Sequence, residues 1–394
     1  MKNESTLKQI LVTLLALVAV GAWAEPSGDR PDATHAWAVH DVNRPDPVKI
    51  TVPAGGIPSD AIILFDGTPG SISNNWCSKD GSASKWIVKD GEFVCTPGSG
   101  SAVTREKFAD CQLHIEWKTP LNDVEGWGNS GVILMGAYEI QILDSSAIVP
   151  SNSPWKPANY ADGQAGAVYG QNPALVNPCR KPGEWQSFDV VFHPPRYEGK
   201  KLVDPGDITV FFNGVLVQDC WKFQGGTGWC RRASKHPTES VGPLTLQDHG
   251  HPVPFRNIWI RKIPSRYDNC VSGGPYVKPG EVQKLRHELA VQTLALAGQA
   301  DDPAEKFIRL WETYCYEPNS AVRPQIDAAT TALVAALKAK DKRVVEMRRA
   351  FAMKRFVAML VKGGFLESGT ELEKTLNAVC AELRKPKASH LRDI

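Results

Sequence analysis

Apolar and polar side chains alternate in several short stretches between residues 62 and 263, which is typical of strands buried on one side. In residues 111–117, Cys, Leu, Ile and Trp alternate with Gln, His and Glu. The turn dipeptides Asp90-Gly91 and Asn213-Gly214 each separate two such stretches and predict hairpins. Further strands are predicted at 130–135, 137–143, 166–169, 186–193, 243–248 and 256–263. With about ten short strands and no long helix among them, the region is predicted to be a sandwich of two antiparallel sheets.

The composition changes near residue 280. Residues 281–394 contain four Gly and one Trp and are rich in Ala, Leu, Lys and Glu. Asp302, Pro303 and Glu305 have the order expected at a helix start: a capping side chain, Pro in the first turn, then an acidic residue. Helical periodicity predicts helices at 280–298, 303–315, 322–340, 342–362 and 370–385. The fold class is therefore predicted to be mainly β, followed by a small all-α region.

The chain begins with a pattern typical of an export signal. An apolar run from Ile10 to Val20 precedes Ala22-Trp23-Ala24, an A-x-A cleavage motif. The run is shorter than the ~20 residues needed to cross a membrane, and no later stretch approaches that length. We predict a signal peptide at 1–24 and an exported, periplasmic or secreted protein. The remaining boundaries are predicted as an extended arm at 25–58, the sandwich at 59–266, a linker at 267–280 and the helical region at 281–394.

Composition narrows the function further. Hydrophobic residues make up 42% and charged residues 22% of the chain, as in folded proteins. The net charge of +2 gives no reason to expect a nucleic-acid partner. The nine Cys residues include no CxxC pair, so no zinc or redox site is indicated. Export makes disulfides possible, for example Cys77–Cys95 or Cys220–Cys230, and reduced buried thiols are the open alternative.

The predicted strand 138–144 carries the first candidate chemistry. Alternation places Glu139 and Gln141 on one face and the apolar residues on the other. Asp144 has the opposite parity unless a bulge intervenes. Two carboxylates about 5–5.5 Å apart could perform retaining glycoside hydrolysis. The alternative is a polar row that simply faces solvent.

A second candidate is the segment Gln247-Asp248-His249-Gly250-His251, at the end of a predicted strand. Histidine titrates near neutrality and can be a base or a metal ligand, and Asp248 could tune either role. Arg256 follows and could orient a ligand. The alternative is a polar turn that Arg256 braces.

Three further residues are candidates for substrate binding. Asn129 and Trp127 belong to a Gly-rich turn before the strand 130–135, and Tyr169 ends the predicted strand 166–169. Tyr169 could stack on a sugar or form a hydrogen bond with it, or could simply pack against the protein. Trp127, Trp155 and Trp229 could form apolar platforms for sugar rings, or pack against other loops.

Eight short motifs occur in a fixed order along the chain. They are Leu64-Phe65-Asp66-Gly67, Asn129-Ser130-Gly131-Val132, Tyr138-Glu139-Ile140-Gln141-Ile142-Leu143-Asp144, Gly166-Ala167-Val168-Tyr169-Gly170, Pro182-Gly183-Glu184-Trp185, Asn213-Gly214-Val215, Leu246-Gln247-Asp248-His249-Gly250 and Arg256-Asn257-Ile258-Trp259. Together they resemble the 3-keto-disaccharide hydrolase domain family over about residues 35–265. The resemblance implies a concanavalin-like jelly roll.

The resemblance also implies cleavage of glycosides whose glucose ring is oxidised at C3. The ketone acidifies the C2 proton, so a base can form an enolate, the aglycone leaves from C1, and water adds to give 3-keto-glucose. The implied roles are His249 as base or metal ligand, Glu139 as acid/base, and Gln141 and Asn129 as orienting donors. Polar motif residues of the family also map onto Asp144 and Gln247. Carboxylates or a bound divalent metal ion suit the remaining roles, and no organic cofactor is expected.

The implied partners are an oxidised glycoside or disaccharide and a sugar 3-dehydrogenase acting upstream. Asp144 and Gln141 differ from the Glu and Asp that laminarinase-type enzymes use, which favours the keto-sugar route. Two alternatives stay open: a retaining β-glucanase and a non-catalytic carbohydrate-binding module.

Overall fold

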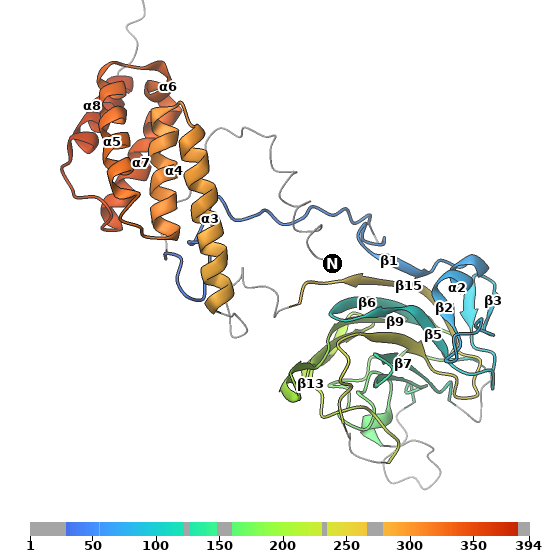
Figure 1. Cartoon of the computed structure of the whole chain (residues 1–394). Helices are drawn as coiled ribbons and strands as arrows, with labels where there is room; N and C mark the ends of the chain where they lie inside the picture. Colours follow the sequence, from blue (N-terminus) through green and yellow to red (C-terminus); the bar gives the residue numbers. More distant parts are fainter. Residues whose placement is uncertain are drawn as a thin grey trace, which may run out of the picture. The chain divides into compact units, whose positions relative to one another are not determined.

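The computed structural model describes residues 29–54, 56–121, 127–147, 160–230, 235–265 and 279–384. The predicted signal peptide, most of the predicted linker, Trp155 and Cys270 lie outside these residues. The chain divides into two compact units (Figure 1). One is Lys49–Ser265, and the other combines the described residues up to Val48 with those from Pro279 onward.

The larger sheet of the first unit contains eight strands in the order β13-β12-β9-β6-β15-β4-β3, with β1 also paired to β15. Its strands are β1 (Ile62–Phe65), β3 (Ile87–Lys89), β4 (Glu92–Val94), β6 (Cys111–Trp117), β9 (Gln186–His193), β12 (Asp207–Phe212), β13 (Val215–Lys222) and β15 (Pro254–Lys262). Neighbouring strands pair antiparallel, as the hairpin signals predicted.

The second sheet has five strands in the order β2-β5-β14-β7-β8. They are β2 (Trp76–Cys77), β5 (Ala102–Phe108), β7 (Ser130–Leu134), β8 (Tyr138–Ile142) and β14 (Gly242–Leu246). Smaller elements are helix α2 (Pro69–Asn75), the 3-10 helix η1 (Ala161–Gly163) and a hairpin of β10 (Arg196–Glu198) and β11 (Lys201–Asp204).

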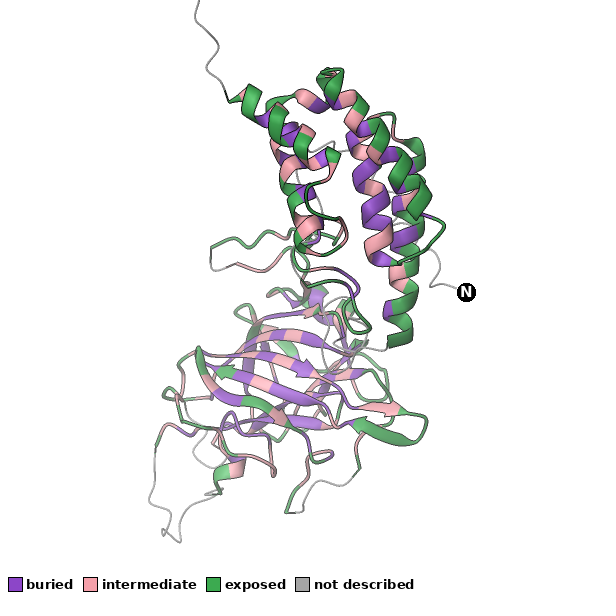
Figure 2. Cartoon of the chain, turned by 90° about the vertical axis from the view of Figure 1, so that its left-hand side faces the viewer, coloured by how far each residue is buried: buried purple, intermediate pink, exposed green. Residues whose placement is uncertain are grey.

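One apolar core holds the first unit together. Buried and partly exposed residues alternate along the long strands (Figure 2). The Trp117 ring lies 5.2 Å from that of Phe188 and 5.6 Å from that of Phe212. The predicted jelly-roll sandwich of two antiparallel sheets is therefore confirmed.

Some local predictions need correction. Residues 166–169 do not form a regular strand; Val168 makes single bridges to Ile140 and Asn172. Strand β5 was not predicted because three exposed polar residues interrupt its alternation. The eight described Cys residues are free thiols, so neither Cys77–Cys95 nor Cys220–Cys230 is bridged.

The second unit is a bundle of helices. They are α3 (Pro279–Gln299), α4 (Pro303–Tyr316), α5 (Arg323–Lys338), α6 (Lys342–Val345), α7 (Met347–Lys362) and α8 (Glu371–Leu383). The predicted helix 342–362 is divided at Glu346, whose extended backbone breaks it and whose side chain caps α7. Among the described helices, none combines the length and apolar character required to cross a membrane.

The N-terminal segment is part of this bundle. Ala36 and Trp37 are buried in a cluster with residues of α3 and with Tyr316 of α4. The Tyr316 hydroxyl donates to Asp41 Oδ2 at 2.7 Å and accepts from Asn43 Nδ2 at 3.0 Å. Residues 29–48 therefore supply buried apolar and polar contacts to helices that are more than 230 positions away in the sequence.

Removing the Tyr316 hydroxyl should loosen this segment. Tyr316→Phe removes the donor to Oδ2 of the buried Asp41 carboxylate, so we expect a loss of about 1–3 kcal/mol in the unfolding free energy of the bundle. Amide hydrogen exchange in α3 and α4 measures the effect. Tyr314→Phe on the same helix is the control, because its hydroxyl makes no hydrogen bond within the described residues. Equal exchange in both variants would contradict the contact.

Candidate active site

Glu139 and Gln141 lie on the outer face of the five-stranded sheet. Their neighbours on β8, Tyr138, Ile140 and Ile142, face the core and are almost fully buried. The pairing of β7 with β8 runs without a register shift from Leu134–Tyr138 to Ser130–Ile142. The bulge that would have turned Asp144 to this face is therefore absent from β8.

The pairing of neighbouring strands aligns the side chains of this face in two rows that run across the strands. Thr245 pairs with Ile133, and Ile133 pairs with Glu139. Beyond β8, the Tyr169 amide donates to the Glu139 carbonyl at 3.0 Å, which places these residues opposite each other. Opposite residues of an antiparallel pair have side chains about 5 Å apart at Cβ. Glu139 and Tyr169 are thus neighbours on one surface.

The adjacent row contains two amides and two small residues. The backbone N–H of Gln247 donates to the Gly131 carbonyl, and Gly131 pairs with Gln141. The backbone N–H of Gln141 donates to the Ala167 carbonyl. Because Gly131 has no side chain, the Glu139 side chain lies over it. A Cβ at position 131 would overlap Glu139 Oε1 and lie 2.9 Å from its Cγ. The glycine thus leaves room for the carboxylate.

Within the described part of the chain, no opposite charge or hydrogen-bond donor compensates the Glu139 carboxylate. The residue is 8% exposed, and within the described residues its side chain makes no hydrogen bond or ion pair. Burial alone raises the pKa of this carboxyl to about 7. A carboxyl that titrates near neutrality can both accept and donate a proton, as acid–base catalysis requires.

Amide and phenol groups surround this carboxyl. Gln141 Nε2 donates to Asn129 Oδ1 at 3.2 Å. Gln247 Oε1 is buried and has no hydrogen-bond partner in the described part of the chain. Burial, the hydroxyl of Tyr160 at 3.3 Å and the nearby Glu139 carboxylate raise the pKa of Tyr169. The phenol therefore stays protonated at neutral pH and can donate a hydrogen bond.

His249 lies in the exposed bend that follows β14. It follows Gln247 by two residues, is exposed, and stacks on His251 with ring centroids 6.1 Å apart. Within the described residues its imidazole makes no hydrogen bond to Glu139, Gln141 or Asn129. Its neighbour Asp248 accepts from the backbone amides of Gly100 and Gly250 and thereby braces the turn.

Asp144 and Trp127 shape the turn beyond β8. The Asp144 carboxylate accepts from the amide and hydroxyl of Ser146 at 3.0 and 2.7 Å. The Asp144 amide donates to the carbonyl of Trp127, which has a left-handed φ of 58°. Asp144 is thus engaged in a local turn, and within the described residues no hydrogen bond or ion pair joins its carboxylate to Glu139.

Arg256 lies on the other sheet. Its Nε donates to Glu116 Oε2 at 2.6 Å, and its guanidinium stacks on Trp185 at 4.0 Å. Beside it, His114 Nδ1 bonds Asp189 at 2.6 Å. Although burial opposes it, the carboxylates of Asp189 and Glu116 raise the pKa of His114. These groups satisfy one another and so form a structural network on the outer face of the eight-stranded sheet.

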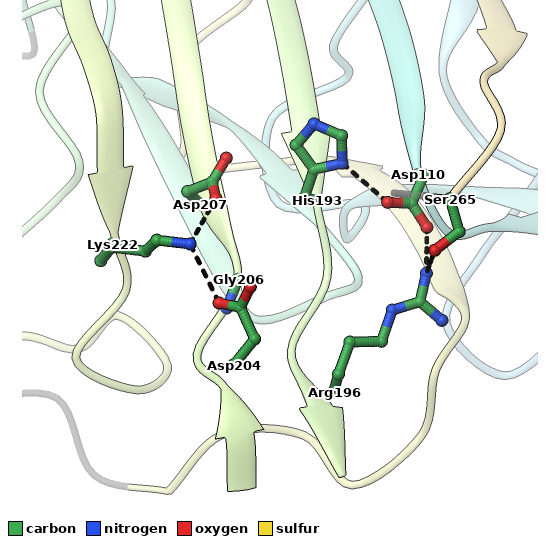
Figure 3. Close-up of polar contacts among 8 residues, drawn as sticks. All are labelled: Asp110, His193, Arg196, Asp204, Gly206, Asp207, Lys222 and Ser265. Atoms are coloured by element: carbon green, nitrogen blue, oxygen red, sulfur yellow. Dashed lines mark hydrogen bonds and ion pairs between the residues drawn. The ribbon is translucent and has the colours of Figure 1, made fainter. Parts of the chain in front are cut away.

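A further polar cluster closes one end of the same sheet (Figure 3). Asp110 binds His193 Nδ1 at 2.7 Å and pairs with Arg196. Lys222 bridges Asp204 and Asp207 at 3.0 and 2.7 Å. Sequence reasoning did not single out these residues, which are scattered over loops and strand ends. Each charge there meets an opposite charge, so the cluster anchors strand ends.

The donors described around Glu139 do not form a metal-binding set. Across the ranges that the structure describes, no three His, Cys, Asp or Glu side chains gather in a way that could hold a metal ion. The polar neighbours of Glu139 are amides and a phenol.

The sequence also matches a family model described as "3-keto-alpha-glucoside-1,2-lyase-like domain". The match covers residues 60–261, just over half of the chain and nearly all of the sandwich. The chain belongs to this family. The predicted resemblance is thereby confirmed, and with it the carbohydrate-active, glycosyl-hydrolase-like character of the sandwich.

Solved structures give further similarities. A protein of Parabacteroides distasonis ATCC 8503 described as a "putative glycosyl hydrolase" is 38% identical, with 56% of this chain and 93% of that chain covered and a TM-score of 0.49. A second protein of that organism with the same description is 22% identical, with coverages of 55% and 100% and a TM-score of 0.40. The alginate lyase Aly36B, as a mutant with alginate trisaccharide, is 12% identical, with coverages of 52% and 98% and a TM-score of 0.29. No curated protein matches the chain.

The buried carboxyl has a consequence for stability. Because its pKa rises from about 4.5 to about 7 on folding, the folded state favours the protonated form. The contribution of this group to the free energy of unfolding is therefore fully present below pH 4.5 and is lost as the pH rises through about 7. Glu139→Gln should therefore raise the unfolding free energy at pH 8 by up to roughly 3 kcal/mol and change it little at pH 4.

Thermal or denaturant unfolding of the variant and the wild type at both pH values measures this difference. Glu198→Gln, at an exposed position on β10, is the matched control and should show no pH-dependent gain. A Glu139→Gln effect that is the same at pH 4 and pH 8 would show that the carboxyl titrates normally.

Proposed function

We propose that this protein cleaves 3-keto-glycosides by eliminating the aglycone and hydrating the product. The observation that supports this most is the buried Glu139 carboxyl, held between amides and a phenol on the outer face of the sheet. The family to which the chain belongs supports a keto-sugar substrate.

In the first step, the Glu139 carboxylate removes the proton from C2 of the sugar. The electrons of the C2–H bond form a C2=C3 double bond, and negative charge moves to the C3 oxygen. Gln141 Nε2 and the Tyr169 hydroxyl are the donors that stabilise this enolate oxygen. The buried Gln247 Oε1 accepts a hydrogen bond from a sugar hydroxyl.

In the second step, the enolate re-forms the C3 ketone and the C1–O bond breaks, leaving a C1=C2 double bond. The leaving oxygen takes the proton that Glu139 holds. Water then adds its hydroxyl to C1 and a proton to C2, which gives 3-keto-glucose. His249, in the exposed bend that follows β14, is the second acid–base candidate for the leaving group.

The structure favours this route over direct displacement. A retaining glucanase needs two carboxylates that face the same bond. Asp144, the second carboxylate of that hypothesis, accepts from Ser146 in a local turn. This local contact supports the keto-sugar route. A retaining β-glucanase and a non-catalytic binding module are outcomes that the substrate assay distinguishes.

The proposal also includes the cellular setting. The apolar run and A-x-A motif of residues 1–24 support export to the periplasm or beyond. A 3-keto-glycoside must be made by oxidation of a glycoside at C3, so a sugar 3-dehydrogenase must act before this enzyme.

Assays with 3-keto-trehalose and 3-keto-glucosides, followed by release of 3-keto-glucose, test the activity. Glu139→Gln should lower kcat/KM by about 10²–10⁴-fold because it removes the base. In the wild type, kcat/KM should rise with pH with a midpoint near 7, since only the ionised carboxyl accepts the C2 proton.

Three controls accompany this assay. His249→Ala measures the contribution of the imidazole, and EDTA tests a divalent metal ion. Unoxidised β-glucan should not be cleaved. Sugar binding without release of 3-keto-glucose from any linkage would identify a binding module instead.

A further inference from the structure

A hollow of about 530 Å³ lies beside Glu139. Tyr169 connects the two, because it lines the hollow and pairs with Glu139 across the strand register. The remaining lining comes from three segments: Tyr160 and Asp162, Gly170 and Gln171, and the segment 224–230, which carries Trp229. A glycoside with its keto ring over Glu139 would thus have this hollow at one end of its scissile bond.

Aromatic side chains give the hollow an apolar surface open to solvent. Trp229 is 66% exposed and Tyr160 is 37% exposed. Their rings meet edge to face with centroids 5.9 Å apart, and Tyr160 meets Tyr169 in the same way at 6.3 Å. Exposed aromatic groups gathered in a concave site mark a ligand surface.

Close packing at two glycines and the hydrogen bonds of Gln171 fix the segments that line the hollow. A Cβ at Gly163 would overlap the Tyr160 ring, so the glycine lets the ring pack on the chain. Gly170 has a φ of 68°, and a Cβ there would lie 3.3 Å from the Gly228 carbonyl. Gln171 joins the two sides: its Nε2 donates to the Gly225 carbonyl at 2.8 Å and its Oε1 accepts from the Gln224 amide at 3.0 Å.

Polar groups complete the lining. The side chains of Asp162 and Gln224 lie on the hollow among the aromatic residues. The combination of ring faces with acceptors and donors suits a sugar ring, whose C–H faces pack on aromatic surfaces and whose hydroxyls need hydrogen bonds. Among the described residues that line the hollow, none is basic and Asp162 is acidic, which favours a neutral sugar over an acidic one.

We propose that Trp229 and Tyr160 form the subsite for the leaving group, and that this subsite binds a neutral pyranose ring. The assignment of this subsite to the leaving group rests on the proposed function, because only a cleaved glycoside has a leaving group. Trp229 and Tyr160 then determine which leaving groups are accepted, while Glu139 performs the proton transfer.

The first test measures binding without turnover. Trehalose and methyl glucoside, both unoxidised, are titrated calorimetrically into the full chain. Trp229→Ala should weaken trehalose binding about tenfold, and Trp229→Phe should restore most of it. Trp185→Ala is the control, because Trp185 lies on the eight-stranded sheet under Arg256.

The second test measures turnover of 3-keto-trehalose against methyl 3-keto-glucoside. Trp229→Ala should lower kcat/KM about tenfold for the disaccharide and leave the methyl glycoside unchanged. Equal losses for both substrates, or unchanged trehalose binding in the variant, would overturn the subsite. If the wild type cleaves no keto-sugar but trehalose binding still depends on Trp229, the proposed function fails and the sugar site stands.

Discussion

The reactivity proposed for this sandwich depends on one buried carboxyl, which has no partner among the described residues. Glu139 is nine-tenths buried, lies over a glycine, and has no described charge or donor to stabilise its ionised form. Burial of an uncompensated carboxylate costs free energy and moves its pKa toward neutrality. The rest of the molecule maintains this position: the strand register fixes the backbone, and the aromatic core beneath keeps the sheet rigid.

The surroundings of Glu139 decide which chemistry that carboxyl can perform. Its neighbours are the amides of Gln141 and Gln247 and the phenol of Tyr169, which donate or accept hydrogen bonds without adding charge. A second carboxylate nearby would have suited nucleophilic displacement. Neutral donors beside one titratable group instead suit removal of a proton next to a ketone and stabilisation of the resulting enolate.

Much of this arrangement could be predicted from the sequence, because alternation determines which side chains share a face. The pattern of 138–144 placed Glu139 with Gln141, and the predicted strand 243–248 placed Gln247 at a strand end. The pattern could not show that β14 lies beside β7, which is a tertiary pairing between segments over 100 residues apart. Asp144 and Arg256 were expected near the site, but a local turn holds the first and the opposite sheet carries the second. The packing of residues 29–48 on α3 and α4 was also not predictable, since that segment has no periodicity.

The most direct test of the central claim is deuterium incorporation at C2 of the product when the wild type cleaves a 3-keto-glycoside in D₂O. If Glu139 removes the C2 proton before the aglycone leaves, NMR will show deuterium at C2 in step with product formation, with C4 as the internal control for exchange beside the ketone. Product that forms at the same rate with protium retained at C2 would contradict the account.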